Sequence, residues 1–344
     1  MRDFLAGLGK FIITIIVILL LIVYAVPVAE EHYVKFIESK DIVGKAWMTA
    51  MDDSLRLNEI TIPGTHDSAT TYVQLPFFSN CQQLTISEQL AAGFRYLDIR
   101  LGVETKKDGT SKLKLMHGFT SCKKGLAPWK GNLYLEDVLK ECYKFLENNP
   151  GETIIFTVKQ EYGEDSVADF QNLLNTYIEK DKDKWLLTDA RFLPTLKEAR
   201  GKLVLLRRYE DEAVLGKNAG MFFGWKDQGG TVVKEIPYEE NLGEDFTRNI
   251  NIPIHYVQDR YEYGKTAKWK AFYYGFSNPA NAESGDAFIN FLSTKGTLKY
   301  GHPFYFAFSL NKKLLECEPG DGNYGWIIVD FGTKELASKI YGMN

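Results

Sequence analysis

Reactive side chains follow three short apolar segments in the first third of the chain. The segments ITIPGTHDSAT, RYLDIRLG and KLMHGF carry His66, Asp67, Asp98, Arg100 and His117. One imidazole can accept a proton while a second donates one, and a guanidinium can stabilise negative charge that develops on phosphorus. These residue types are therefore the ones needed to cleave a phosphodiester without a metal ion.

The elements that position these residues follow a repeated pattern from residue 57 onward, in which a short apolar run precedes a loop or a helix. Alternation of strands and helices predicts a parallel sheet. Eight such runs in about 280 residues predict an α/β fold, a closed (β/α)8 barrel of the TIM type. The eight expected strands are Asn58–Ile62, Tyr96–Leu101, Leu113–His117, Thr153–Lys159, Leu203–Arg208, Ile254–Gln258, Phe288–Leu292 and Trp326–Asp330.

Apolar residues at helical spacing predict helices over residues 87–94, 133–151 and 166–180. Ser87 is the expected N-cap of the first of these, since a serine side chain can accept a hydrogen bond from the first helical turn. The aromatic run over residues 303–309 has the propensity of a ninth strand, but its proline near the start is equally compatible with a helix.

Composition excludes several functional classes. The 344 residues are 45% hydrophobic, carry a net charge of −4 and contain no run of lysine or arginine, so a large core is expected and nucleic-acid binding is not. We find no P-loop, no glycine-rich nucleotide motif before a helix, no HExxH and no cluster of three acidic residues. The sequence therefore predicts neither a metal nor a cofactor.

Cysteine content is low and gives no disulfide framework. The four cysteines, in no CxxC pattern, leave one or two bridges open if the domain is extracellular. They are Cys81, Cys122, Cys142 and Cys317.

The N-terminal region has the character of a membrane segment. The run Phe11–Ala29 is almost entirely apolar, with basic residues before it and acidic residues after it. Its length and flanks favour a single-pass anchor with the following chain outside the cytoplasm, and a cleaved signal peptide, hence a secreted protein, is the alternative. We therefore expect a signal-anchor or transmembrane segment over residues 1–30, a helical stalk over 31–55 and one catalytic barrel over 56–344.

Most of the expected strands end in a charged or hydrogen-bonding residue. Active sites of (β/α) barrels lie at the carboxyl ends of their strands, so these side chains should meet in one pocket. Such a pocket, rich in both charge signs, suits a polyhydroxylated and phosphorylated ligand. Beyond the residues named first, the strand ends contribute Lys159, Arg207, Arg208, Asp259, Tyr261 and Asp330.

Taken together, these motifs resemble the bacterial phosphatidylinositol-specific phospholipases C and the wider X-domain family. The resemblance runs from about residue 55 to residue 335 and rests on IPGTHDS, DIR, MHG, NPGETIIFTVKQEY, GKLVLLRRY, VQDRY, INFLS and GWIIVD. It implies an irregular (β/α) barrel, in agreement with the strand pattern. It also implies an enzyme of the phosphorus–oxygen lyase or phosphoric diester hydrolase class that acts on phosphatidylinositol in a bilayer. We expect this enzyme to be a monomer.

The resemblance also implies roles for the two histidines. His66 would be the general base, with the Asp330 carboxylate holding its tautomer, and His117 would be the general acid, with Asp67 as its partner. His66 would take the proton of the inositol 2-hydroxyl, which attacks the adjacent phosphorus. His117 would protonate the departing oxygen. The products would be diacylglycerol and inositol 1,2-cyclic phosphate.

The remaining implied contacts are to the phosphate and to the inositol ring. Arg100 would bind the phosphate oxygens, with Asp98 tied to the same site. The inositol contacts would come from Lys159, Arg208, Asp259 and Tyr261.

Three features depart from the family pattern. Arg207 stands where lysine is usual, and the loop after His117 is longer than in the compact bacterial enzymes. The exposed rim tryptophan has no clear match, with Tyr300 nearest and Phe77 and Phe78 as candidates at another rim loop.

Three alternatives stay open. The chain could cleave glycosyl-phosphatidylinositol or another lipid phosphodiester, or it could be a non-catalytic, membrane-tethered lipid-binding module. A calcium-dependent lipase of the X-domain type is disfavoured because Arg100 stands in the expected cation position. Among the other histidines, we expect His32 beside the membrane, His255 within a strand as a structural residue and His302 in a loop.

Overall fold

We describe the fold from a computed structural model of the chain. The residues that the structure describes are 7–19, 46–127, 129–163, 165–187, 192–209, 220–225, 227–229, 247–249, 255–277, 286–296, 302–319 and 323–344.

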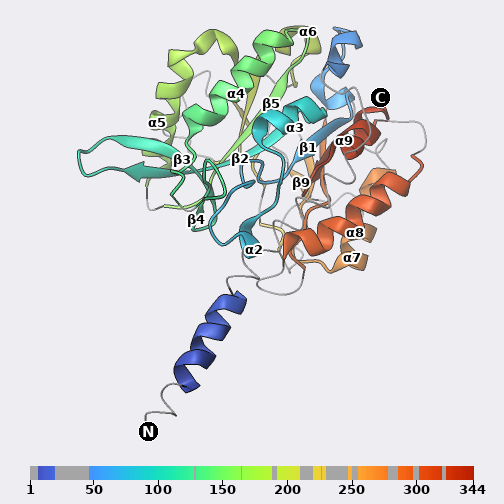
Figure 1. The fold of residues 1–344 in the computed structure, drawn as a ribbon. Helices are drawn as coiled ribbons and strands as arrows, with labels where there is room; N and C mark the ends of the chain where they lie inside the picture. Colours follow the sequence, from blue (N-terminus) through green and yellow to red (C-terminus); the bar gives the residue numbers. More distant parts are fainter. Residues whose placement is uncertain are drawn as a thin grey trace.

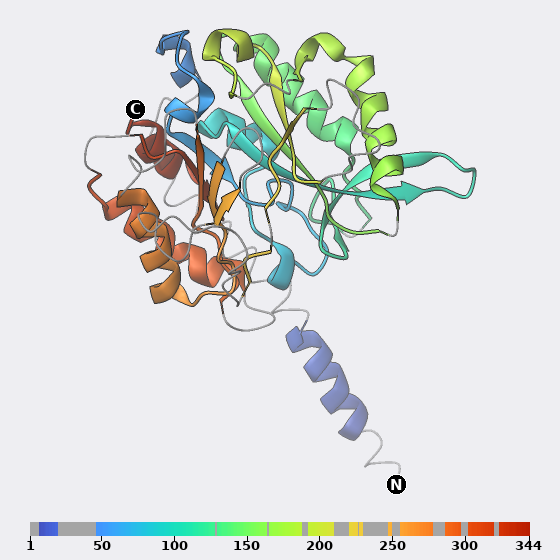
Figure 2. The ribbon, with the colours of Figure 1, turned by 180° about the vertical axis from the view of Figure 1, so that it is seen from behind.

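The centre of the protein is a curled sheet of parallel strands with helices on its outer face (Figures 1 and 2). Seven parallel strands follow one another in the order β7, β5, β2, β1, β12, β11 and β10. Their bounds are β7 Leu203–Arg207, β5 Ile154–Gln160, β2 Tyr96–Thr105, β1 Ile62–Thr65, β12 Trp326–Val329, β11 Ala287–Phe291 and β10 His255–Gln258.

Short strands border this central sheet. Two of them run parallel to β7, and one pairs with β10 in the antiparallel sense. They are β6 Trp185–Leu186, β8 Met221–Phe222 and β9 Thr247–Asn249. Among the described residues no ladder joins β9 or β10 to β7 or β8, so the observed architecture is a curled, TIM-like sheet and not a fully closed barrel.

Two of the expected strands differ from the prediction. The run Leu113–His117 does form a strand, β3 Ser111–His117, but it pairs antiparallel with β2 and with the short β4 Thr120–Ser121. It is therefore one arm of a hairpin and not a member of the parallel set (Figure 1). The first strand begins at Ile62 and not at residue 58, because residues Leu57–Glu59 form a 3₁₀ turn.

The helices follow the sequence pattern closely. They are α2 Pro76–Ser79, α3 Ile86–Ala92, α4 Leu135–Asn148, α5 Val167–Lys180, α6 Leu196–Ala199, α7 Lys265–Ser277, α8 Pro303–Glu316 and α9 Lys334–Tyr341, with 3₁₀ turns at Trp47–Ala50, Leu57–Glu59 and Lys182–Lys184. The N-cap of α3 is Thr85, so the prediction of Ser87 was wrong, since Thr85 and Glu88 form a reciprocal capping box. The aromatic run 303–309 is helical, with its proline in the first turn of α8.

Hydrophobic contacts pack the helices against the sheet in two outer layers. One layer joins α4 and α5 to the side of the sheet formed by β2, β5 and β7. The other joins α7, α8 and α9 to the side that contains β12. A third apolar cluster fills the inside of the curled sheet around Tyr96 and Trp326, both fully buried. The sheet is therefore supported on both faces, and the carboxyl ends of its strands are held rigidly.

The N-terminal segment is described only in part. Residues 7–19 form a helix, whereas residues 20–45, which include the end of the expected membrane segment and most of the expected stalk, lie outside the described residues. Among the described residues, no helix combines the length and the apolar content that a bilayer crossing requires. Met48 is fully buried, so the chain packs against the main folded body from the turn at Trp47–Ala50 onward.

Candidate active site

A cavity of about 740 Å³ opens at the carboxyl ends of the parallel strands. Eight of the ten site residues predicted from the sequence line it, and the other two, Asp67 and Asp98, are buried directly behind it. The eight lining residues are His66, Arg100, His117, Lys159, Arg208, Asp259, Tyr261 and Asp330. The structure therefore brings together every residue that the sequence analysis placed at strand ends, except Arg207.

Arg207 and Arg208 separate because successive side chains of a strand point to opposite faces. Arg207 donates hydrogen bonds to the backbone carbonyls of Gly220 and Tyr209 in the protein interior. Arg208 faces the cavity.

The turn after β1 aims two adjacent side chains in different directions. Asp67 has a φ of 46°, a left-handed conformation that few residues other than glycine adopt. The turn is held by hydrogen bonds from the Asp67 amide to Asp98 Oδ2 (3.2 Å) and from Thr70 Oγ1 to the Asp67 carbonyl (2.7 Å). As a result His66 reaches the cavity, while the Asp67 carboxylate is buried beneath it.

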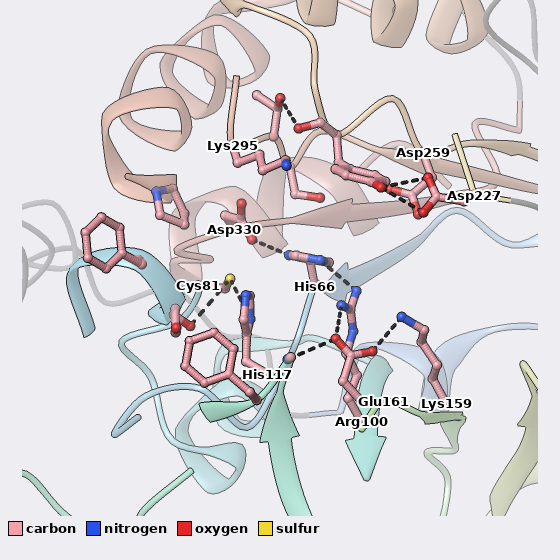
Figure 3. A pocket seen from close by; sticks show the side chains of 18 of the residues that line it. His66, Cys81, Arg100, His117, Lys159, Glu161, Asp227, Asp259, Lys295 and Asp330 are labelled. Atoms are coloured by element: carbon pink, nitrogen blue, oxygen red, sulfur yellow. Dashed lines mark hydrogen bonds and ion pairs between the residues drawn. The ribbon is translucent and has the colours of Figure 1, made fainter. Parts of the chain in front are cut away.

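His66 is held between an anion and a cation. Its Nδ1 lies 2.7 Å from Asp330 Oδ1, and its Nε2 lies 2.8 Å from an Arg100 nitrogen. Because a guanidinium only donates hydrogen bonds, His66 Nε2 must be the acceptor, and the proton of the neutral ring must be on Nδ1. Burial alone would lower the pKa of His66, but the Asp330 carboxylate outweighs it, and the pKa lies above its usual value. The ring therefore presents a basic nitrogen to the cavity (Figure 3).

His117 faces the same cavity from the end of β3 (Figure 3). Its Nδ1 lies 2.5 Å from Asp67 Oδ2, so the buried carboxylate fixes the orientation of the ring. The His117 side chain is 26% exposed, whereas Asp67 is 1% exposed. With Nδ1 facing Asp67, Nε2 is the nitrogen left to exchange a proton with a ligand.

Arg100 is held by three carboxylates. It donates to Asp98 Oδ2 through two nitrogens at 3.1 and 2.9 Å and to Glu161 Oε1 at 3.3 Å, and it lies 3.6 Å from Asp67 Oδ2. Asp98 is fully buried and also accepts a hydrogen bond from Arg208 at 3.1 Å. Although burial favours the neutral acid, Arg100 and Arg208 hold the pKa of Asp98 well below its usual range. One buried carboxylate therefore fixes two guanidinium groups in the cavity wall.

The opposite wall contains residues that the sequence analysis did not select. Trp225 lies under Arg208, with the guanidinium carbon 3.6 Å from a ring centroid, and donates to Asp259 Oδ2 at 3.1 Å. Asp227 accepts from the Tyr261 hydroxyl at 2.7 Å. Both new residues come from the stretch 210–250, whose irregular sequence gave no signal beyond a loop.

Glu161 is a further site residue that the sequence did not identify as functional. It pairs with Lys159 at 2.5 Å and accepts from the Gly118 amide at 3.1 Å, in addition to its contact with Arg100. Burial raises its pKa, but Arg100 and Lys159 outweigh this effect, so it is ionised at neutral pH. Its position two residues after the strand-end Lys159 was the only signal in the sequence.

Apolar side chains surround the mouth of the cavity. Leu75, Phe78 and Phe119 line it with exposed fractions of 45%, 40% and 66%. Trp129, in the loop after His117, is 84% exposed. The rim is therefore apolar, in contrast to the charged interior.

The remaining histidines and cysteines have other surroundings. His255 is confirmed as a core residue, stacked on Phe223 with its Nε2 3.1 Å from the Gly224 carbonyl. His302 caps α8 by accepting from the Phe304 amide. His32 and Tyr300 lie outside the described residues. All four cysteines are free, so the structure contains neither of the disulfides that the sequence left open.

The sequence of the first half of the catalytic body matches a known family. Residues 54–209 match the family described as "Phosphatidylinositol-specific phospholipase C, X domain". A "1-phosphatidylinositol phosphodiesterase" of Listeria monocytogenes is 33% identical over 201 residues, a segment that spans 54% of this chain and 57% of that relative. A protein of the same description from Staphylococcus aureus is 24% identical over 323 residues, or 87% of this chain and 93% of the relative.

Solved structures share the fold over nearly the whole catalytic body. The phosphatidylinositol-specific phospholipase C of L. monocytogenes is 26% identical, with a TM-score of 0.64 over 88% of this chain and 99% of the other. The F249X mutant of the S. aureus enzyme is 24% identical, with a TM-score of 0.68 over 88% of this chain and 100% of the other. The second half of the curled sheet, beyond the matched X domain, therefore has the same architecture as these proteins.

Proposed function

We propose that this chain, whose residues 54–209 match the X domain of phosphatidylinositol-specific phospholipases C, cleaves phosphatidylinositol to diacylglycerol and inositol 1,2-cyclic phosphate without a metal ion. The proposal rests on one observation above all. Two histidines, each beside a buried carboxylate, face one cavity together with the Arg100 guanidinium. That arrangement provides a base, an acid and a cation for a single phosphodiester.

In this mechanism His66 acts first. A substrate phosphate takes the place of His66 as hydrogen-bond acceptor for Arg100, and His66 Nε2 is then free to accept the proton of the inositol 2-hydroxyl. The deprotonated oxygen attacks the neighbouring phosphorus, an intramolecular step that gains from proximity and needs no bound water. Asp330 stabilises the imidazolium that forms, because its carboxylate lies 2.7 Å from Nδ1.

Arg100 and His117 complete the reaction. The guanidinium stabilises the additional negative charge on the five-coordinate phosphorus, a contribution of about 3 kcal/mol for a single donor of this kind. His117 Nε2 then protonates the departing diacylglycerol oxygen. Slow hydrolysis of the cyclic ester, in which the two histidines exchange roles, would give inositol 1-phosphate.

The charge balance around Arg100 supports a reaction that needs no divalent cation. Asp67, Asp98 and Glu161 all lie within 3.6 Å of its nitrogens, so the guanidinium already provides the counter-charge of these carboxylates. A fixed guanidinium with several donors can do the electrostatic work that a metal would otherwise do at a phosphate.

The inositol ring would occupy the opposite wall of the cavity. Lys159, Arg208 and Asp259 can bind its hydroxyl groups, and Tyr261 can pack against its face. The Lys159 ammonium can donate hydrogen bonds to hydroxyl oxygens, although burial and the nearby Arg100 charge lower its pKa. Trp225 would hold Arg208 and Asp259 in place through its contacts with both.

The apolar rim would contact the lipid surface. Phe78 and Phe119 line the cavity and are exposed, so their insertion into a bilayer would bring the phosphodiester to the histidines. We further propose that the apolar N-terminal segment 11–29 delivers the chain to the outer membrane face, as an anchor or as a cleaved signal. Fractionation of the producing cells, with N-terminal sequencing of the mature protein, distinguishes these outcomes.

The function is tested with the full chain and lipid vesicles in the presence of EDTA. We expect diacylglycerol release from phosphatidylinositol and none from phosphatidylcholine. Release from glycosyl-phosphatidylinositol alone would identify that lipid, and not phosphatidylinositol, as the substrate. No release from any phosphodiester lipid would leave a non-catalytic binding module, and loss of activity in EDTA would indicate a calcium-dependent enzyme.

A further inference from the structure

A thiol lies between the two histidine–carboxylate pairs, and the proposed mechanism does not use it. Cys81 follows α2, is 1% exposed and lines the cavity. Its backbone is fixed, because its amide donates to Thr70 Oγ1 at 3.1 Å and its carbonyl accepts from the Phe331 amide at 2.7 Å. Its Sγ lies 3.8 Å from His117 Nδ1.

Cys81 completes two groups of three metal-binding side chains. One group is Asp67, Cys81 and His117, and the other is His66, Cys81 and Asp330; within each group the donor atoms lie within 4.8 Å of one another. One thiolate sulfur, one imidazole nitrogen and one carboxylate oxygen form a donor set that zinc binds well. The site that the sequence analysis considered free of metal ligands therefore contains such a set, in residues that are far apart in the sequence.

The first group is the better site because of where the positive charge lies. An Arg100 nitrogen lies 2.8 Å from His66 Nε2, so the guanidinium would repel a cation bound to His66. The same guanidinium lies farther from the other group, 3.6 Å from Asp67 Oδ2. The Asp67 group thus has two potential anionic ligands, Asp67 and the Cys81 thiolate, at a greater distance from the competing charge.

The distances also fit this group. Zinc–sulfur and zinc–nitrogen bonds of about 2.3 and 2.0–2.1 Å in a tetrahedral site separate sulfur from nitrogen by roughly 3.6 Å. The observed separation of Cys81 Sγ and His117 Nδ1 is 3.8 Å. The ion would enter between Asp67 Oδ2 and His117 Nδ1, which now lie 2.5 Å apart, so these two atoms must separate by about 1 Å.

We propose that Asp67, Cys81 and His117 form a zinc-binding site that switches the enzyme off. On binding, zinc displaces the proton on His117 Nδ1 and the proton of the Cys81 thiol, and both protons pass to solvent. The fourth position of the ion faces the cavity. With His117 bound to the metal and its ring displaced from Asp67, the leaving oxygen has no correctly placed acid. Calcium and magnesium, which prefer oxygen ligands, do not compete for the thiolate.

Cobalt titration of the full chain tests the binding directly, with TCEP present to keep the thiols reduced. A thiolate bound to cobalt(II) gives an intense charge-transfer band in the near ultraviolet, and we expect that band in the native protein. It should vanish in Cys81→Ser and persist in the matched control Cys317→Ser, whose thiol lies at the end of α8. Absence of the band in the native protein, or its persistence in Cys81→Ser, would overturn the site.

Zinc affinity gives a second, independent measurement. Loss of an outer-shell partner typically weakens a metal site 10–100-fold, so removal of a direct ligand should weaken it by roughly 100-fold or more. Competition with a chromophoric chelator should therefore show that loss in Cys81→Ser and less than about a threefold change in Cys317→Ser. Equal affinities in the two variants would contradict the proposal, even if one of them proved less stable.

Zinc binding can be tested whatever the enzyme's substrate, whereas the expected inhibition by zinc rests on the proposed function. Zinc should stop diacylglycerol release, excess EDTA should restore it, and calcium should have no effect. Each variant is compared with its own rate without zinc, and the zinc concentration for half-inhibition should rise at least tenfold in Cys81→Ser. Zinc binding without inhibition would refute the switch. A native protein inactive on every lipid would refute the proposed function and leave the cobalt result to decide the site.

Discussion

Replacement of His117 by alanine should affect activity to an extent that depends on the leaving group. With phosphatidylinositol the departing group is an alkoxide, a poor leaving group that needs a proton. With an inositol 4-nitrophenyl phosphodiester the departing phenolate is stable without one. A residue that acts only as the general acid should therefore matter for the first substrate and hardly at all for the second.

The magnitude follows from the position of His117. A well-placed general acid contributes 10²–10⁴-fold, or about 2.7–5.5 kcal/mol of the activation free energy. The 2.5 Å contact of His117 with the buried Asp67 indicates good placement, so we expect a loss near the upper end of this range with phosphatidylinositol. With the nitrophenyl substrate we expect a loss below about tenfold.

The fold should tolerate this change. Truncation of His117 leaves Asp67 buried, but Arg100 lies 3.6 Å away and still provides a counter-charge. The assay is the initial rate of the purified variant on both substrates, with His66→Ala as the control. Because His66 is the base for both reactions, its variant should lose activity equally on the two. Equal losses for His117→Ala on both substrates would refute its assignment as the acid.

Three further substitutions test the roles of Asp330, Arg100 and Glu152. Asp330→Asn removes the charge that raises the pKa of His66, so the acid limb of the pH profile of kcat/KM should move to lower pH while the maximal rate falls; an unchanged limb would exclude His66 as the titrating base. Arg100→Lys should lower kcat by about 10²–10³-fold and leave KM unchanged, because an ammonium cannot reproduce the fork of hydrogen-bond donors that a guanidinium offers to a phosphate. Stopped-time assays over a range of substrate concentrations would measure both constants. Glu152→Gln should destabilise the fold by about 3–5 kcal/mol in urea unfolding, since it leaves the fully buried Arg95 without its counter-charge at 2.9 Å; a loss below 1 kcal/mol would contradict it.

The pairing of His66 with Asp330 could be predicted because it depends on parallel strand pairing alone. β1 and β12 are adjacent and parallel, with Thr65 opposite Val329, so the residues that follow them, His66 and Asp330, must lie side by side. Short motifs at the ends of strands are therefore sufficient to place His66, the proposed base, beside the Asp330 carboxylate.

The apolar pattern wrongly placed β3 among the parallel strands, and the short connection from β2 shows why. Its apolar pattern matches that of a parallel strand, but a parallel connection needs a dozen or more residues. Only five residues, Lys106 to Thr110, separate β2 from β3, and they form a tight turn with Gly109 at a φ of 83°. The length of this connection was a better guide than the apolar pattern.

The inositol-side wall could not be predicted because its contacts join distant, irregular segments. Trp225 meets Arg208 and Asp259 only after the sheet has curled, and nothing in its local sequence marks it as a site residue. Cys81 is similar, because its proximity to His117 depends on how α2 is folded over the strand ends. Such contacts depend on tertiary packing and have no period or motif.

In the proposed mechanism the inositol 2-hydroxyl, and not water, attacks the phosphorus that lies between the two histidines. A phosphorus NMR time course of the full chain with phosphatidylinositol vesicles and EDTA tests it most directly. We expect inositol 1,2-cyclic phosphate to appear first and inositol 1-phosphate to follow only slowly. Inositol 1-phosphate as the first product, with no cyclic ester at early times, would contradict it.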